Sequence, residues 1–169
     1  PPTIAVPTIP TSTPAPTATP DCSSIRIESL AVAADHLVAS VSNNTGVDMP
    51  LSNSQLTWEN VGGRNQFVNW FKWNNRNYYG GDDSNSPTNA SCSGGDCAFP
   101  DTRTMTWEAD FNNVGAVLYG DFQLDLSFAD VCTISGTLSL AEPAIDCNLL
   151  EVNKVWFVDD DFRVRVRNN

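Results

Sequence analysis

The sequence GDFQLDLSF, residues 120–128, decides the fold class of this chain. Its apolar and polar residues alternate without interruption. One face carries Phe122, Leu124, Leu126 and Phe128, and the other carries Asp121, Gln123, Asp125 and Ser127. Because successive side chains of a β-strand point to opposite faces, the segment is predicted to be a strand with one buried and one solvated face.

The same period of two recurs along the chain and predicts further strands. These lie at residues 25–32, 36–43, 66–73, 104–111 and 132–140, with one more around Leu56 and Trp58. No helix of ten or more residues is predicted. About seven antiparallel strands with one apolar face each are best buried as two packed sheets, so we predict an all-β, immunoglobulin-like antiparallel β-sandwich. Residues 74–100, rich in Asn, Gly, Ser and Asp, are predicted to form a long loop with little regular structure.

The last 24 residues look like a second copy of the start of this module. Residues 146–169, DCNLLEVNKVWFVDDDFRVRVRNN, align without a gap to residues 21–44, DCSSIRIESLAVAADHLVASVSNN. The alignment matches Cys22 to Cys147 and keeps the apolar positions of both expected strands at one constant offset. Such an offset indicates tandem repeats. We therefore expect a β-sandwich module at residues 21–145, and at 146–169 either the first two strands of a following repeat or donated strands.

Residues 1–20 are predicted to be an extended linker. They contain seven prolines, six threonines and no charged residue, a composition that favours polyproline II. Thr11 and Thr13 are candidate acceptors for O-linked glycans. A purely solvated spacer has no need of Ile4, Val6 and Ile9, so we expect these three residues to contact a neighbouring module.

Five cysteines in a chain with a Thr/Pro-rich segment favour an oxidising, extracellular or cell-surface compartment. Cys92 and Cys97 flank two glycines and are predicted to pair. Cys22 opens the module and Cys132 lies near its end, so a bond between them would tie the first strand to the last. Cys147 is then expected to be unpaired in this chain. A Cys132–Cys147 bond remains an alternative.

The formal net charge of -11 argues against nucleic acid and anionic membranes as partners. No apolar stretch is long enough to insert into a membrane, and no basic, apolar signal sequence opens the chain. This pattern is what we expect of a mature or internal piece of a secreted protein.

No nucleophile, metalloprotease or phosphate-loop motif occurs in the sequence, so we predict no catalytic residue and no enzymatic activity. The single histidine, His36, is interpreted as an exposed turn residue. Asp82, Asp83, Asp96 and Asp101 offer oxygen ligands but lack the spacing of a calcium-binding loop. We therefore predict no cofactor and no metal site.

A cluster of aromatic residues supports an alternative function, which is carbohydrate binding. Trp70, Trp73, Tyr78 and Tyr79 are interleaved with amide side chains that suit sugar hydroxyls. Packing is the favoured interpretation, because Trp70 and Trp73 fall on opposite faces of their strand. Asn43 and Asn89 head N-glycosylation sequons, so glycans are possible attachments.

The order of features resembles the Cys-bracketed β-sandwich repeats of large secreted bacterial surface proteins. These features are the Thr/Pro linker, Cys22, the strand ending in Leu-Thr-Trp58, and Phe-Ala-Asp-Val-Cys132. The resemblance implies an adhesive, stalk or filament-building role without catalysis. We expect a structural repeat module of an extracellular filament or cell-surface fibre whose partners are other copies of itself. Its contacts would include Phe162, Val164 and Val166 of the terminal segment.

Overall fold

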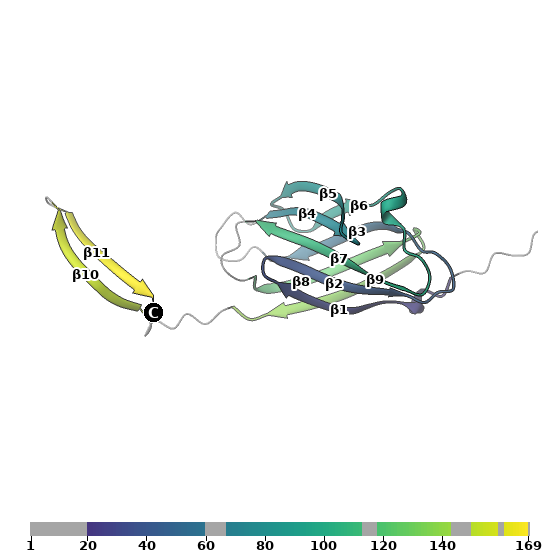
Figure 1. Cartoon of the computed structure of the whole chain (residues 1–169), viewed down its shortest axis with the longest axis horizontal. Coiled ribbons are helices and arrows are strands. Elements are labelled where there is room, and N and C mark those ends of the chain that lie inside the picture. Colours follow the sequence, from purple (N-terminus) through teal and green to yellow (C-terminus); the bar gives the residue numbers. More distant parts are fainter. Residues whose placement is uncertain (1–19, 60–66, 113–117, 143–149, 159–160, 169) are drawn as a thin grey trace, which may run out of the picture.

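The computed structural model describes residues 20–59, 67–112, 118–142, 150–158 and 161–168 (Figure 1). The first half of the sandwich contains β1 (Ile25–Ala33), β2 (His36–Asn43), β3 (Leu51–Trp58), β4 (Phe67–Trp73) and β5 (Arg76–Asp83). The second half contains β6 (Thr88–Ser91), β7 (Arg103–Asn112), β8 (Gly120–Phe128) and β9 (Cys132–Leu140). Two short 3-10 turns, η1 (Cys22–Ser24) and η2 (Gly95–Cys97), precede β1 and β7.

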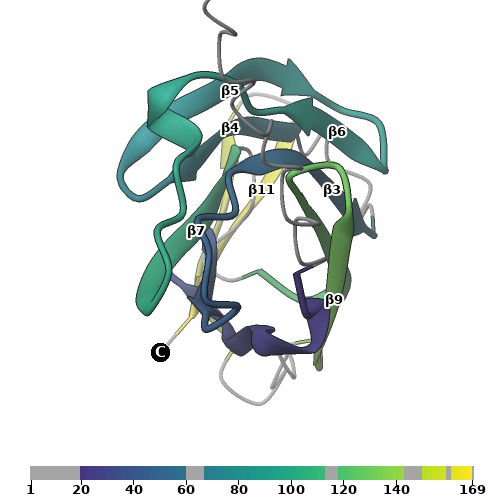
Figure 2. The ribbon, with the colours of Figure 1, turned by 90° about the vertical axis from the view of Figure 1, so that its right-hand side faces the viewer.

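These nine strands form two antiparallel sheets that enclose one core (Figure 2). The first sheet has the order β1-β2-β7-β4-β5, and the second has the order β6-β3-β8-β9. The predicted all-β antiparallel sandwich is therefore confirmed, and its described residues contain nine strands where about seven were expected. The orders β1-β2-β7-β4 and β3-β8-β9 correspond to the A-B-E-D and C-F-G orders of constant-type immunoglobulin domains, while β5 and β6 each extend one edge.

The prediction of a long irregular loop at residues 74–100 is wrong, because β5 and β6 lie within it. β5 pairs with β4 through a tight turn in which Asn74 and Asn75 have φ angles of 48° and 64°. Asparagine adopts this left-handed conformation more readily than most residues, and the twist of such a turn suits a β-hairpin. Gly80 and Gly81 concealed the strand, since glycine has a low strand propensity.

Aromatic side chains are the largest residues in the core between the sheets. Trp73, Trp107, Phe71, Phe99, Phe111 and Phe128 are all fully buried. Several of their rings meet edge to face, including Trp58 with Phe111 at 5.5 Å and Trp73 with Phe99 at 5.1 Å between ring centroids. Such pairs stabilise beyond their burial, because the positive edge of one ring meets the negative face of the other.

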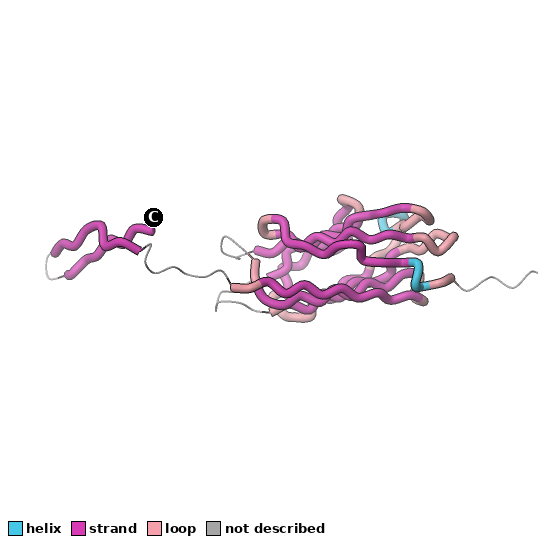
Figure 3. Tube along the Cα trace, turned by 90° about the horizontal axis from the view of Figure 1, so that it is seen from below, coloured by secondary structure: helices cyan, strands magenta, loops and turns pink. Residues whose placement is uncertain are grey.

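Both predicted disulfides are present. Cys22–Cys132 joins η1 to the first residue of β9 with a Cα–Cα distance of 5.3 Å, and Cys92–Cys97 closes the segment around η2. The chain enters the sandwich beside Cys22, and β9 leaves at the opposite end (Figures 1 and 3). The module is therefore arranged with its two chain ends at opposite poles.

Candidate functional site

Two further strands, β10 (Leu150–Val158) and β11 (Asp161–Asn168), form a separate two-stranded sheet (Figure 1). Their register repeats that of β1 and β2 in every pair at an offset of 125 residues. Ile25 opposite Asn43 becomes Leu150 opposite Asn168, and Ala33 opposite His36 becomes Val158 opposite Asp161.

The two hairpins also share an irregularity. The register shifts between Ile27 and Ser29 in β1, and it shifts between Val152 and Lys154 in β10. These positions correspond at the same offset. A bulge adds an unpaired residue and sets which side chains face the core, so its position is a specific feature of a strand pair. The likeness of the segments therefore extends from sequence to backbone pairing.

One face of the β10–β11 hairpin exposes apolar side chains. Val152, Val155, Phe162 and Val164 are between 44% and 61% exposed. Their counterparts at the 125-residue offset are Ile27, Leu30, Leu37 and Ala39, which pack in or against the core. We call this exposed face of the hairpin, defined by Val152, Val155, Phe162 and Val164, the assembly face.

The assembly face contains two of the predicted contact residues, Phe162 and Val164. The backbone of Val166 continues β11, but its side chain lies outside the described residues, as do Ile4, Val6, Ile9 and Cys147. Phe162 and Val164 are larger than Leu37 and Ala39, both of which are fully buried in this module. Their larger volumes would overpack the site that β1 and β2 occupy here, so the hairpin requires a core shaped for it.

The four aromatic residues of the carbohydrate alternative do not form one surface. Trp73 is fully buried, and its Nε1 donates to the carbonyl oxygen of Ala98 at 3.1 Å. The hydroxyl of Tyr78 lies between the sheets, accepting from Trp107 Nε1 at 2.6 Å and bonding to Ser54 Oγ at 2.7 Å. Burial raises the pKa of Tyr78. Trp70, Tyr78 and Tyr79 are each partly exposed. Because Trp73 is fully buried and the Tyr78 hydroxyl bonds between the sheets, the four residues do not form the predicted platform.

The structure does not accommodate a glycan on Asn43, because this side chain is fully buried. Asn43 Nδ2 donates to the carbonyl oxygens of Val47 and Phe99, and its Oδ1 accepts from Thr45. Every polar atom of the amide is thus used by the fold. Asn89 is exposed on β6 and stays a predicted acceptor. Thr11 and Thr13 lie outside the described residues.

His36, interpreted from the sequence as an exposed turn residue, lies beside the β1–β2 turn with a partly exposed side chain that has two acidic neighbours. It is the first residue of β2, and its Nε2 lies 3.1 Å from Asp110 Oδ1 and 3.4 Å from Asp35 Oδ1. Asn69 Nδ2 donates to the other oxygen of Asp110 at 2.8 Å, and the Trp70 ring meets the imidazole edge to face at 5.1 Å. Sequence reasoning missed this cluster because only the β2–β7 register brings His36 opposite Asp110.

Three of the four acidic residues considered as calcium ligands have separate partners. Asp96 pairs with Arg76, Asp101 accepts from the backbone of Gly46, and Asp83 accepts from the backbone of Asn85. Among the described residues, the group of His, Cys, Asp or Glu side chains close enough to hold a metal ion is Asp35, His36 and Asp110.

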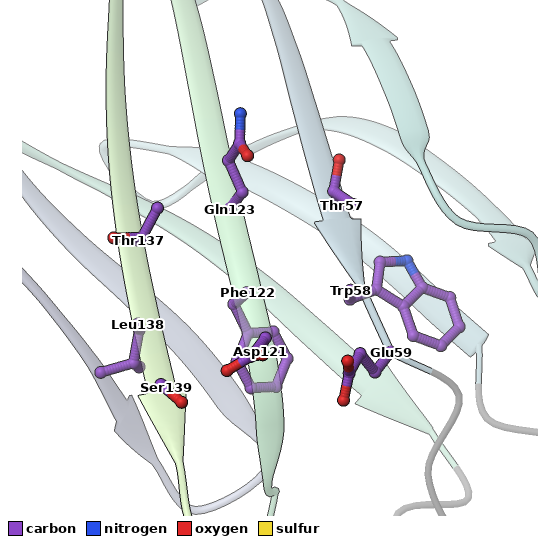
Figure 4. A pocket seen from close by; sticks show the side chains of 9 residues that line it. All are labelled: Thr57, Trp58, Glu59, Asp121, Phe122, Gln123, Thr137, Leu138 and Ser139. Atoms are coloured by element: carbon purple, nitrogen blue, oxygen red, sulfur yellow. The ribbon is translucent and has the colours of Figure 1, made fainter.

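A cleft of about 460 Å³ lies on the second sheet near the end of β3 (Figure 4). The cleft is lined by two rows of outward-facing side chains across the strands. One row contains Thr57, Gln123 and Thr137, and the other contains Glu59, Asp121 and Ser139. The lining also includes Trp58, Phe122 and Leu138, which lie between the two rows along the strands and face the core. The strands β3, β6, β8 and β9 contain no Lys or Arg, so this face offers hydroxyl, amide and carboxylate groups.

The fold and these features define a class, which is a disulfide-linked, antiparallel β-sandwich with a separate hairpin. Beyond that class, no protein-family model, no curated protein and no solved structure matches the chain. Within the described residues, no helix is both long and apolar enough to cross a membrane.

Proposed function

We propose that this chain is a structural repeat module of an extracellular filament or cell-surface fibre. The observation that carries the proposal is the shared register of β1–β2 and β10–β11, including the shared bulge. In this proposal the β10–β11 hairpin begins a second module of the same type, and its partner is the remainder of that module.

The exposed assembly face supports this role. A two-stranded hairpin is at best marginally stable alone, and Val152, Val155, Phe162 and Val164 are exposed apolar side chains on one such hairpin. In the complete module, the equivalent face of β1 and β2 is covered by the second sheet, with Ile27 and Leu30 packed near Gly136 of β9. A second sheet of the same kind is therefore the occupant that fits the assembly face.

The disposition of the chain ends also favours a fibre. Because the chain enters at one pole and leaves at the other, consecutive modules extend along one axis instead of folding back (Figure 3). The Cys22–Cys132 bond ties the entering segment to β9, the strand through which the chain leaves. Two disulfides fit the oxidising conditions outside cells. The function proposed is therefore mechanical.

Negative-stain microscopy of native material, compared with two variants, tests the proposal. Val164→Asp places a charge on the assembly face, and Val47→Asp is its matched control because both valines are similarly exposed, at 44% and 48%. We expect regular fibres from the native protein and the control, and shortened or absent fibres from Val164→Asp. Compact, monodisperse native particles at high concentration would reject the proposal.

The cleft on the second sheet favours a second candidate, a carbohydrate-binding or adhesin function at a place other than the predicted aromatic residues. Hydroxyl, amide and carboxylate side chains without nearby basic residues on the same strands suit a neutral, hydroxyl-rich ligand. A glycan array compares Gln123→Ala with Gln55→Ala, which changes the same residue type on the same sheet outside the cleft. Binding lost only in Gln123→Ala supports this candidate, and a native protein that binds no glycan excludes it.

A further inference from the structure

We propose that Asp35, His36 and Asp110 form a binding site for a divalent transition-metal ion, with Zn²⁺ as the ion that suits it best. The site joins the β1–β2 turn to β7 at the pole where β9 leaves the module (Figure 1). It goes beyond the fibre function, which requires no metal.

The spacing of the three ligand atoms is the first argument. His36 Nε2 lies 3.1 Å from Asp110 Oδ1 and 3.4 Å from Asp35 Oδ1, and one ligand atom from each of the three residues lies within 4.8 Å of the other two. Zinc binds nitrogen and carboxylate oxygen at about 2.0–2.2 Å in tetrahedral geometry, which places neighbouring ligand atoms about 3.3–3.6 Å apart. The two distances from Nε2 are therefore close to those of a ligand set.

The number of available protons is the second argument. Both carboxylates approach the same imidazole nitrogen, and Nε2 carries at most one proton. A single proton is shared between two acceptors that each bear a negative charge. When the proton of the neutral ring is on Nδ1, Nε2 becomes a third acceptor beside the two carboxylates. A cation bound among the three groups would balance their negative charge.

Neighbouring residues contact all three of the ligand residues. The side chain of Asp110 is only 10% exposed, and its Oδ2 accepts from Asn69 Nδ2 at 2.8 Å. The Trp70 ring contacts the imidazole, and the backbone carbonyl oxygen of Asp35 accepts from the amide of Phe111 at 3.1 Å. Hydrogen bonds to ligand carboxylates and rings that restrict ligand orientation are a general feature of protein metal sites.

The ligand types favour zinc over calcium. One imidazole nitrogen and two carboxylate oxygens match the nitrogen and oxygen set of open zinc sites, whereas Ca²⁺ takes six to eight oxygen ligands. His36 and Asp35 are partly exposed to solvent, so a water molecule can complete the tetrahedron.

Calorimetric titration of the untagged native protein with ZnCl₂ tests the site, with CaCl₂ and MgCl₂ as comparisons. We expect one Zn²⁺ per module and an affinity reduced at least about tenfold by His36→Ala or Asp35→Asn. Asn69→Ala is expected to reduce the affinity about 10- to 100-fold, since it releases the Asp110 carboxylate. Glu108→Gln, which alters another outward carboxylate of β7, should leave the affinity unchanged.

A spectroscopic readout separates metal binding from a folding defect. His36 is the only histidine in the sequence, so its imidazole ¹⁵N signals in NMR spectra need no further assignment. We expect Zn²⁺ to shift the Nε2 signal of the native protein, because Nε2 is the proposed ligand atom. The proposal is overturned if Zn²⁺ leaves the Nε2 signal unchanged, or if stoichiometric binding survives both His36→Ala and Asp35→Asn. Asp35 lies on the exposed turn, so Asp35→Asn is the variant less able to disturb folding, and a loss of Zn²⁺ binding in it reports on the site itself.

Discussion

At the scale of single residues, buried polar side chains connect parts of the sandwich that the backbone ladders leave separate. Tyr78 on β5 accepts from Trp107 on β7 and bonds to Ser54 on β3, so its hydroxyl links the two sheets. Indole Nε1 can only donate, and a buried phenol proton needs an acceptor, so Tyr78 donates to Ser54. Asn43 similarly connects the end of β2 to the segment that precedes β7.

Replacing Tyr78 with Phe is expected to lower the free energy of unfolding by about 1–3 kcal/mol. The change leaves the Trp107 indole N–H and the Ser54 hydroxyl buried without this partner, and unsatisfied buried groups are costly. Urea denaturation under non-reducing conditions measures the effect. Tyr79→Phe is the control, because it removes the same hydroxyl from the neighbouring residue of β5. A loss of similar size in the control would contradict the account.

Alkaline pH should also destabilise the module through Tyr78. Burial raises the pKa of Tyr78 above the ordinary value of 10.0, so the folded protein retains a proton that the unfolded chain loses above that pH. Burial and the nearby Asp83 and Asp82 raise the pKa of Tyr79 in the same direction. The free energy of unfolding should therefore fall as the pH rises above about 10, and less steeply in Tyr78→Phe. Equal slopes in both proteins would count against this origin.

At the scale of elements, β1 and β9 close one side of the sandwich. Each is the edge strand of its sheet, and the Cys22–Cys132 bond joins their beginnings. Gly136 gives β9 a gap in its inward row, into which Ile27 and Leu30 of β1 pack. A Cβ at Gly136 would lie 2.9 Å from Ile27 Cδ1, too close for ordinary contact.

Gly136→Val is expected to destabilise the module by about 1–3 kcal/mol, because it overpacks the contact between β1 and β9. Rotation of Ile27 can absorb a single added methyl group, so the branched side chain makes the stronger test. Thermal and urea unfolding measure the change. Gly80→Ala is the control, since its Cβ would meet no atom closer than Asn69 O at 4.0 Å. A fully stable Gly136→Val protein would show that this contact is loose.

The alternation of apolar and polar residues predicted most elements closely, and the bounds of β8 and β9 agree with the structure. Each of these strands has one solvent-exposed face, so polar and apolar residues alternate along its sequence. β5 was missed because Gly80 and Gly81 interrupt the alternation of apolar and polar residues. The His36 cluster and the burial of Asn43 were missed for another reason. Both depend on which strands are neighbours, and a single sequence does not determine strand register.

At the scale of the whole molecule, the Cys22–Cys132 bond determines how tension would cross the module. The two cysteines are separated by 110 residues in the sequence. Only β9 lies between Cys132 and the point where the chain leaves the module. Force applied to the two chain ends therefore passes through the disulfide and β9, while the other strands of the sandwich stay outside the direct path. This arrangement suits an inextensible fibre.

Single-molecule stretching of the native protein should show this effect. Under oxidising conditions, the 110 residues enclosed by the disulfide should add no length. After reduction, unfolding of one module should add about 370 Å, at roughly 3.4 Å for each released residue. The double variant Cys22→Ser with Cys132→Ser should extend without a reductant. Full extension of the oxidised native module would contradict this force path.

The most direct test of the central claim is hydrogen exchange measured on the native protein by mass spectrometry. The claim is that β10–β11 serves a second module as β1–β2 serves the first. It predicts that amides in residues 150–168 are protected to a similar degree as those in residues 25–43, because a second sheet covers the assembly face. Exchange of residues 150–168 at the rate of an unfolded chain, while residues 25–43 remain protected, would contradict it.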